Sequence, residues 1–417
     1  MKFVSPRGRP LPVTARGWAV LGLAFLLYLA ANQTQVSWLY VFAALGAGIW
    51  LAAAGVPGAA LRALSLRRTL SAAEPDGDAE VRVGDPVTVT LTLHNASRWP
   101  AAQVRGAEIC AFAPAAERDQ TFFVDVPAHG ALTLRYTVPA ARRGWFEFAP
   151  VPLTSRAPFG FWAAARPAPA PGAVLIFPEY RELPSLPVLD RRPAAQNPYA
   201  RIGAGSEFLG VREYRPGDSP RHVHWRTSAR VGRLVVREFA EETQPGVLIA
   251  LDVHAASVIG PADDNTLERT IKVAATLVHY ADRRGLAVSL AAASEAWPAP
   301  VGPLSRWAAL SYLARVAGDG GQPFETTLRG LAPAACVAAL MPRPDEAAVP
   351  ALLELKGQGV EVLAVVVDPA PFDPAWAGRA AALAGQLRAA GVSVRVVGAE
   401  PDWERSLAAD DRAAVRW

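Results

Sequence analysis

Residues 205–239 combine arginine, acidic and aromatic side chains at a density that the rest of the chain does not match. Its aromatic residues include Tyr214 and Trp225, and Pro216-Gly217-Asp218 predicts a turn between these two. The segment carries charged residues of both signs, among them Arg212, Arg215, Arg221, Arg226, Arg230 and Arg233 with Glu207, Glu213, Asp218 and Glu238. A guanidinium binds a carboxylate or a phosphate through two hydrogen bonds, and aromatic side chains are enriched in interaction hot spots. This motif is therefore a candidate recognition surface.

Two interpretations of the motif remain open. In the first, the arginines and the two aromatic residues form a docking surface for another molecule. In the second, the arginines pair with the neighbouring acidic residues in an internal network, in which each exposed pair contributes about 0 to 1 kcal/mol to stability. The sequence alone favours neither.

Catalysis and nucleic-acid binding have weaker support in the same segment. Asp218 and His222 are candidates for acid–base chemistry, but their spacing does not show that they converge in one cleft. His222 and His224 would share one face of a strand, yet no cysteine or third ligand lies nearby to complete a zinc site. The net charge of +4 is small for 417 residues, and the interleaved carboxylates would repel nucleic-acid phosphates. We expect no nucleic-acid partner.

The residues from Gly205 to Leu234 read G-x-E-F-x-G-x-R-E-Y-R-P-G-D-x-P-R-x-x-x-W-R-x-S-A-R-x-G-R-L, which resembles the signature of the bacterial domain-of-unknown-function family 58. Arg143-Gly144 and Pro158-Phe159-Gly160 are similar to two further elements of that family. Ala157 and His224 stand where family members usually or often carry Asp, and Arg226 where many carry Lys. The resemblance implies a leading membrane hairpin and a MoxR-type AAA+ ATPase as a partner.

The N-terminal segment predicts such a hairpin. From Gly17 to Leu61 the chain contains no charged residue, which leaves room for two spans of about 20 residues, separated by the polar Asn32-Gln33-Thr34-Gln35. A buried helix pair in a soluble protein is the alternative. Arginine and lysine flank both ends of the segment, so we expect a two-pass protein of the bacterial inner membrane with both termini in the cytoplasm: Lys2, Arg7, Arg9 and Arg16 before it, and Arg62, Arg67 and Arg68 after it.

An all-β module is predicted to follow the hairpin, over residues 65–165. Asp85–Asn95 alternates apolar and polar residues with the period of a half-buried strand. Turn residues separate it from four further candidate strands, at the spacing of an immunoglobulin-like sandwich: Gln103–Cys110, Thr121–Val126, Ala131–Val138 and Gly144–Phe148. Residues 166–204 are rich in Pro and Ala and predict an extended linker before the motif.

The C-terminal part, residues 241–417, alternates short apolar runs with helical patterns, which predicts a doubly wound parallel sheet of the von Willebrand A type. The expected strands are Val247–Asp252, Leu286–Ala292, Ala335–Met341, Val360–Asp368 and Val392–Val397. The expected helices are 267–281, Leu304–Val316, Asp345–Gln358 and Trp376–Ala390. Neither G-x-G-x-x-G nor a Walker A motif occurs, so no nucleotide cofactor is expected.

A metal site at the end of the first of these strands would be degenerate. A von Willebrand A domain places D-x-S-x-S there to bind Mg²⁺ through oxygen atoms, whereas this chain has Asp252, His254 and Ala256. We therefore expect no cofactor, and Asp252 at most as a metal ligand. Two cysteines, Cys110 and Cys336, predict neither a disulfide framework nor a thiolate site.

Together these features predict a non-catalytic, membrane-anchored adaptor that engages cytoplasmic proteins, with a MoxR-type AAA+ ATPase as the partner that the resemblance implies. The predicted organisation is a basic N-terminus and hairpin over 1–64, the β module, the linker, the motif over 205–240 and the α/β domain. The alternative is an enzyme or ligand-binding protein that uses the Arg, Asp and His residues of the motif on a phosphate-bearing or cell-envelope substrate.

Overall fold

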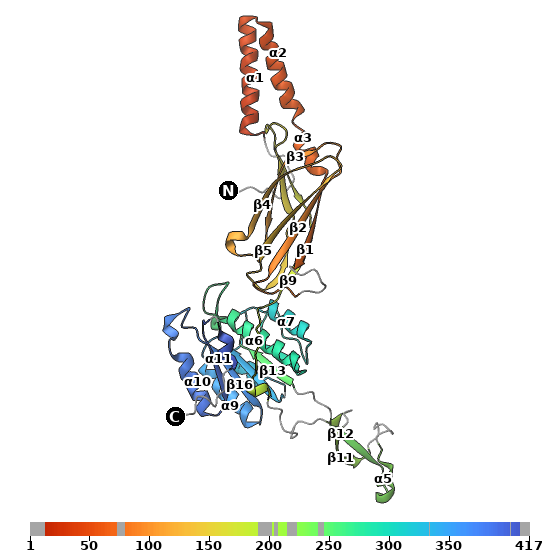
Figure 1. Ribbon diagram of the computed structural model, residues 1–417, viewed down its shortest axis with the longest axis vertical. Coiled ribbons are helices and arrows are strands. Elements are labelled where there is room, and N and C mark those ends of the chain that lie inside the picture. The colour runs from red at the N-terminus through yellow and green to blue at the C-terminus, as the bar shows by residue number, and fades with distance from the viewer. Residues whose placement is uncertain are drawn as a thin grey trace. The chain divides into compact units, whose positions relative to one another are not determined.

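The computed structural model (Figure 1) describes residues 13–72, 80–190, 202–203, 207–214, 223–240, 246–332, 334–400 and 402–408. It divides into two compact units, Met1–Phe177 and Pro178–Trp417, which are treated separately below. The first unit holds the apolar helices and the antiparallel sheets. The second holds the signature motif and the parallel sheet.

Two antiparallel apolar helices open the first unit: α1 (Ala15–Thr34) and α2 (Ser37–Ala52). They meet through small residues, since a Cβ atom added to Gly46 would lie 3.4 Å from Cβ of Ala24. Gln35, in the left-handed conformation with φ 55°, forms the turn between them. Most of their large apolar side chains are exposed, and both runs, Ala15–Thr34 and Ser37–Arg62, are long and apolar enough to cross a membrane.

The short helix α3 (Val56–Arg62) ends the second apolar run and belongs to the β module. Its Pro57 and Leu61 are buried, and Leu61 is part of the same hydrophobic core as the strands. The part of this run that precedes α3 is α2, most of whose large apolar side chains are exposed. At 1.5 Å per residue α2 is about 24 Å long, somewhat shorter than a hydrocarbon core of about 30 Å.

Antiparallel strands form three sheets in the first unit, with the orders β1-β2-β5, β4-β3-β7-β8 and β6-β9. Inward residues of the first two sheets, such as Val89, Leu91, Val104 and Leu153, share one buried core. The strands are β1 (Leu64–Ala72), β2 (Pro86–Asn95), β3 (Ala101–Ile109), β4 (Asp119–Val126), β5 (Ala131–Pro139), β6 (Gly144–Glu147), β7 (Val151–Ser155), β8 (Ala164–Ala168) and β9 (Ala173–Ile176).

All five strands predicted for this unit are present, and the structure adds β1, β7, β8 and β9. The expectation of an extended linker from residue 166 is wrong at its start, because β8 pairs with β7 and β9 pairs with β6. Proline misled the prediction: Pro167 lies in β8, the edge strand of its sheet, where a missing N–H is tolerated.

The second unit contains a five-stranded parallel sheet in the order β14-β13-β15-β16-β17. Its strands match the five predicted ones: β13 (Gly246–Leu251), β14 (Ala287–Ala292), β15 (Cys336–Met341), β16 (Glu361–Val367) and β17 (Ser393–Val397). The helices are α4 (Pro187–Asp190), α6 (Thr266–Arg283), α7 (Arg306–Arg315), α8 (Phe324–Arg329), α9 (Val349–Gly357), α10 (Arg379–Ala389) and α11 (Trp403–Ala408).

Helices cover both faces of this sheet. Alternate residues of β13, Leu248 and Ala250, share a core with residues of α8, α9 and α10 such as Leu328, Leu352 and Leu383. Figure 1 shows α6 and α7 separated from α9 and α10 by the strands. Continuous burial of β13, β15 and β16 explains why each reads as an unbroken apolar run in the sequence.

The signature motif forms a separate small sheet in the order β10-β12-β11, carrying one helix. Its elements are β10 (Ile202–Gly203), β11 (Glu207–Glu213), α5 (Trp225–Val231) and β12 (Val235–Ala240). β11 and β12 are antiparallel, with an irregularity between Phe208 and Gly210.

Candidate protein-interaction site

Several residues of the signature motif fix α5 against β12. The buried hydroxyl of Ser228 accepts a hydrogen bond from the backbone N–H of Val235 at 2.9 Å. Nδ1 of His224 caps the start of the helix by accepting from the N–H of Thr227 at 3.2 Å. Gly232 ends it in the left-handed conformation, with φ 74°, and its N–H donates to the carbonyl of Ser228. The small polar residues and the glycine of the motif therefore have a structural role.

The large residues on α5 face solvent instead. Trp225 is 66% exposed, and Arg226 and Arg230, four residues apart, are also exposed. Within the described part of the chain neither arginine makes an ion pair and Trp225 stacks on no other ring. These three residues are accessible to another molecule, and the docking-surface interpretation of the motif stays a prediction.

The remaining residues of the predicted site differ in how far the structure describes them. Tyr214 is half-buried, and its N–H donates to the carbonyl of Leu234 at 2.9 Å, while Arg233 is exposed. Glu207 and Arg212 lie in β11, but only their backbone is described. Arg215, Gly217, Asp218 and Arg221 lie outside the described residues, as does His222, so the pairing of Asp218 with His222 stays a prediction.

A second group of charged side chains lies at the carboxyl edge of the parallel sheet. The chain leaves β13 toward β14 on one side and leaves β15 toward β16 on the other, so the point between β13 and β15 is where ligands bind in sheets of this kind. Asp252 follows β13, and Arg343 and Asp345 follow β15. The sequence pointed only to Asp252. Arg343 and Asp345 could have been found by their position after the predicted strand Ala335–Met341.

Asp252 is 2% exposed, and its Oδ1 accepts a hydrogen bond from the N–H of His254 at 2.9 Å. Its Oδ2 is buried and has no hydrogen bond of normal geometry to any atom of the described residues. Burial raises the pKa of Asp252, and the Asp345 carboxylate acts in the same direction, whereas the Ser257 hydroxyl, the His254 N–H and Arg343 oppose the shift. Asp252 is thus a buried carboxyl group with one carboxylate and one guanidinium in its surroundings.

Arg343 lies beside this carboxyl group but makes no ion pair with any described residue. Its Nε donates to Oγ of Ser257 at 3.3 Å, and its guanidinium lies 5.6 Å from the centre of the Trp376 ring. Arg379 lies 5.0 Å from the centre of the same ring. The edge therefore carries two arginines around one tryptophan, which suits a carboxylate ligand.

The residues at this edge do not fit Mg²⁺. Asp252 supplies a carboxylate, but Nδ1 of His254 accepts from the N–H of Ala256 at 3.1 Å, and Ala256 offers no side-chain oxygen. The Arg343 guanidinium, whose Nε donates to Ser257, adds positive charge near Asp252, which disfavours a cation there. No group of three His, Cys, Asp or Glu residues in the described ranges is arranged to hold a metal ion.

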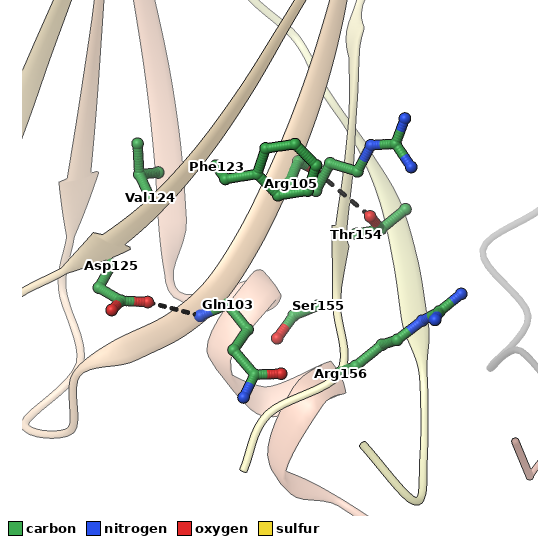
Figure 2. Close-up of a pocket in the computed structure, with 8 residues that line it drawn as sticks. All are labelled: Gln103, Arg105, Phe123, Val124, Asp125, Thr154, Ser155 and Arg156. Atoms are coloured by element: carbon green, nitrogen blue, oxygen red, sulfur yellow. Dashed lines mark hydrogen bonds between the residues drawn. The ribbon is translucent and has the colours of Figure 1, made fainter. Parts of the chain in front are cut away.

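The β module carries a pocket of ≈ 480 Å³ on the outer face of β3, β4 and β7 (Figure 2). Figure 2 shows Arg105 beside Phe123, with the guanidinium 5.3 Å from the ring centre, and Asp125 accepting from the N–H of Gln103 at 2.6 Å. Ser155 donates to the carbonyl of Ala102, so its hydroxyl is occupied structurally. The lining lacks a paired nucleophile and base, and nothing in it suggests catalysis.

Comparison with known proteins gives one family match. Residues 210–327 match the family described as "Protein of unknown function DUF58". The match runs from β11 through α5 and β13 to α8, so it joins the signature motif to the first part of the parallel sheet. It confirms, for these residues, the family that the motif resembles. No curated protein matches the chain significantly.

Solved structures are similar only at a low level. The beta-D-glucoside glucohydrolase of Trichoderma reesei is 11% identical over 27% of this chain and 18% of its own, with a TM-score of 0.16. The Listeria innocua beta-glucosidase is 13% identical over 26% and 17%, with a TM-score of 0.14. An exo beta-N-acetylglucosaminidase of Vibrio harveyi is 10% identical over 80% and 82%, with a TM-score of 0.20. The chain spans less than a fifth of the two glucosidases, and TM-scores this low support no conclusion about fold or function.

Proposed function

We propose that this chain is a non-catalytic, membrane-anchored adaptor that binds an acidic surface of a cytoplasmic protein through α5. One observation carries the proposal: Trp225, Arg226 and Arg230 are exposed on one short helix, and within the described residues no carboxylate neutralises the two arginines. Trp225 presents an exposed aromatic side chain of the type enriched in interaction hot spots, and guanidinium groups supply bidentate contacts to carboxylates.

The anchor in this proposal is the pair of apolar helices α1 and α2. Exposed apolar side chains along both helices support insertion into a bilayer over burial in a soluble core. The arginines that flank the two helices favour the bacterial inner membrane with the sheets on the cytoplasmic side. The two antiparallel sheets around one core support an immunoglobulin-like module, and the parallel sheet with Asp252 after its first strand supports a von Willebrand A-like domain.

The class of partner follows from the family resemblance. A MoxR-type AAA+ ATPase is the partner that the resemblance implies, and such an adaptor would bring the ATPase to the membrane. The edge with Arg343, Trp376 and Arg379 offers a second cationic surface in the same unit. The alternative, an enzyme or ligand-binding site on a phosphate-bearing or envelope substrate, depends on Asp218 and His222.

The test is affinity purification from native membranes, with quantitative mass spectrometry of the proteins that accompany the chain. We compare the wild type with Trp225→Ala and with Arg226→Ala/Arg230→Ala. Trp307→Ala is the matched control, because Trp307 is 61% exposed on α7 of the same unit. Loss of one ATPase from both motif variants, and its retention by the control, supports the proposal. An unchanged partner list in all variants contradicts it.

The enzyme alternative predicts a different pattern. Asp218→Asn/His222→Gln would then abolish cellular function while the accompanying proteins stay the same. An adaptor instead loses function only with variants that also lose the partner.

A further inference from the structure

One end of the β module lies at the ends of the apolar helices. The chain enters the module from α3 at Leu64, which pairs with Asn95 at the end of β2. The start of β3 pairs with the end of β4, and the end of β7 pairs with the start of β8. The β2–β3, β4–β5 and β7–β8 loops, residues 96–100, 127–130 and 156–163, therefore gather at the end where α3 is attached. We call this end the hairpin-proximal rim.

The β7–β8 loop contacts both apolar helices directly. The N–H of Thr14 donates to the carbonyl of Phe161 at 2.9 Å, and Oγ1 of Thr14 donates to the carbonyl of Gly160 at 2.6 Å. Nε1 of Trp162 donates to the carbonyl of Trp50 at 2.9 Å, and the two indole rings are 4.6 Å apart. The loop thus lies level with the start of α1 and the last turn of α2.

The remaining contacts hold the rim in this position. A Cβ atom on Gly17 would lie 2.4 Å from the carbonyl oxygen of Phe161, so α1 approaches the loop more closely than any other residue would allow. Nη1 of Arg166 donates to the carbonyls of Leu61 and Arg62 at 3.0 and 2.9 Å, which ties β8 to the end of α3. The rim is consequently fixed beside the start of α1 and the end of α2.

The rim and the adjacent helix start expose the residue types that bind a membrane surface. Trp99 is 68% exposed and Phe159 is 54% exposed. Arg16, Arg98 and Arg156 are exposed as well, and none of them forms an ion pair with a described residue. Tryptophan is enriched at membrane interfaces, and arginines close to an anionic leaflet are attracted to its headgroups.

We propose that the hairpin-proximal rim binds the surface of the bilayer that the hairpin spans, with Trp99 and Phe159 among the headgroups and Arg16, Arg98 and Arg156 against phosphates of anionic phospholipids. The inference rests on the proposed insertion of α1 and α2 and adds a lipid contact made by the β module itself. The β module then contacts the membrane surface directly and is not attached to it through the hairpin alone.

Site-specific photo-crosslinking of the full-length chain tests the inference. The chain is reconstituted in vesicles of phosphatidylcholine and phosphatidylglycerol, with p-benzoylphenylalanine at position 99 or 159. The matched control carries the same analogue at Trp145, an exposed aromatic residue in β6, near the opposite end of the module where β5 ends. A further position, Leu26 of α1, reports insertion of the hairpin.

We expect lipid adducts at positions 26, 99 and 159, and severalfold fewer at 145. Arg98→Gln/Arg156→Gln should lower the ratio of phosphatidylglycerol to phosphatidylcholine adducts at position 99 severalfold, while adducts at position 26 stay unchanged. Adducts at 26 without an excess at 99 and 159 over 145 would overturn the rim contact and leave the anchor intact. No adducts at 26 would overturn both the anchor and the rim contact.

Discussion

Arginine has opposite surroundings in two regions of this molecule. In the β module, Arg68 is buried and bonds Glu108, whose other oxygen accepts from the Tyr136 hydroxyl. The Arg68 guanidinium also donates to the carbonyl of Ala170 and lies 4.2 Å from the Phe148 ring centre. On α5, Arg226 and Arg230 are exposed and unpaired within the described chain. Arginine content alone therefore does not distinguish a structural arginine from one that is accessible to another molecule, whereas the burial and described contacts of each arginine do.

The largest expected loss of stability comes from replacing the buried Arg68. Arg68→Met should leave Glu108 as an unpaired buried charge and lower the free energy of unfolding by about 3 to 5 kcal/mol. Denaturant unfolding of the detergent-solubilised chain measures it. The control is Arg68→Met/Glu108→Leu, which removes both charges and should recover most of the loss. A loss below about 1 kcal/mol in the single variant would contradict the pairing.

A smaller loss of stability is expected when the hydrogen bond that joins α5 to β12 is removed. Ser228→Ala removes the acceptor of the Val235 N–H, and leaving a buried donor unsatisfied costs about 1 to 3 kcal/mol. Hydrogen exchange at the Val235 amide should accelerate correspondingly. Thr227→Ala is the neighbouring control on the same helix, since no hydrogen bond of the Thr227 side chain is found among the described residues. Equal exchange rates of the Val235 amide in both variants would contradict the hydrogen bond to the Ser228 hydroxyl.

Asp252 and Arg343 are intermediate between the buried ion pair of Arg68 and the exposed arginines of α5: they influence each other electrostatically but form no ion pair among the described residues. Because burial raises its pKa in the folded state, the folded protein favours the protonated form. Its contribution to stability is thus fully present below the unfolded pKa of about 3.9 and is lost as the pH rises through the folded value. Asp252→Asn should therefore raise stability at neutral pH more than at pH values near 4, which unfolding curves at both pH values would detect. A gain independent of pH would contradict the shift.

The smallest effect on stability is expected on α5. Trp225→Ala and Arg226→Ala/Arg230→Ala should each change the free energy of unfolding by less than about 0.5 kcal/mol, because exposed residues without partners contribute little. Thermal unfolding beside the wild type measures this. A loss as large as that of Ser228→Ala would place the three residues in an internal network and remove the basis for a docking surface.

The fold could be predicted from the sequence where one physical signal decides the structure. Alternation identified β2, and unbroken apolar runs identified β13, β15 and β16, because the faces that these strands bury set the pattern. The signal failed at β1, where Arg67 and Arg68 suggested only a basic flank, and at β8, where Pro167 suggested a linker.

The candidate sites were less predictable for a physical reason. The sequence located the charged and aromatic residues of the motif, but whether an arginine has an internal partner depends on packing. Glu108 is 40 residues from Arg68 in the chain, and Trp376 comes to Arg343 from a different βα connection. Such pairs arise only when strands that are distant in sequence become neighbours.

The hydrogen bonds between Thr14 and the β7–β8 loop join residues as far as 147 positions apart. During synthesis at about 5 to 20 residues per second, roughly 7 to 30 seconds separate the emergence of the two partners. During this interval the start of α1 lacks its hydrogen bonds to the β7–β8 loop, which has not yet been synthesised. If the hairpin enters the bilayer first, the membrane holds the helix during this interval, and the β module then folds onto an end that is already in place.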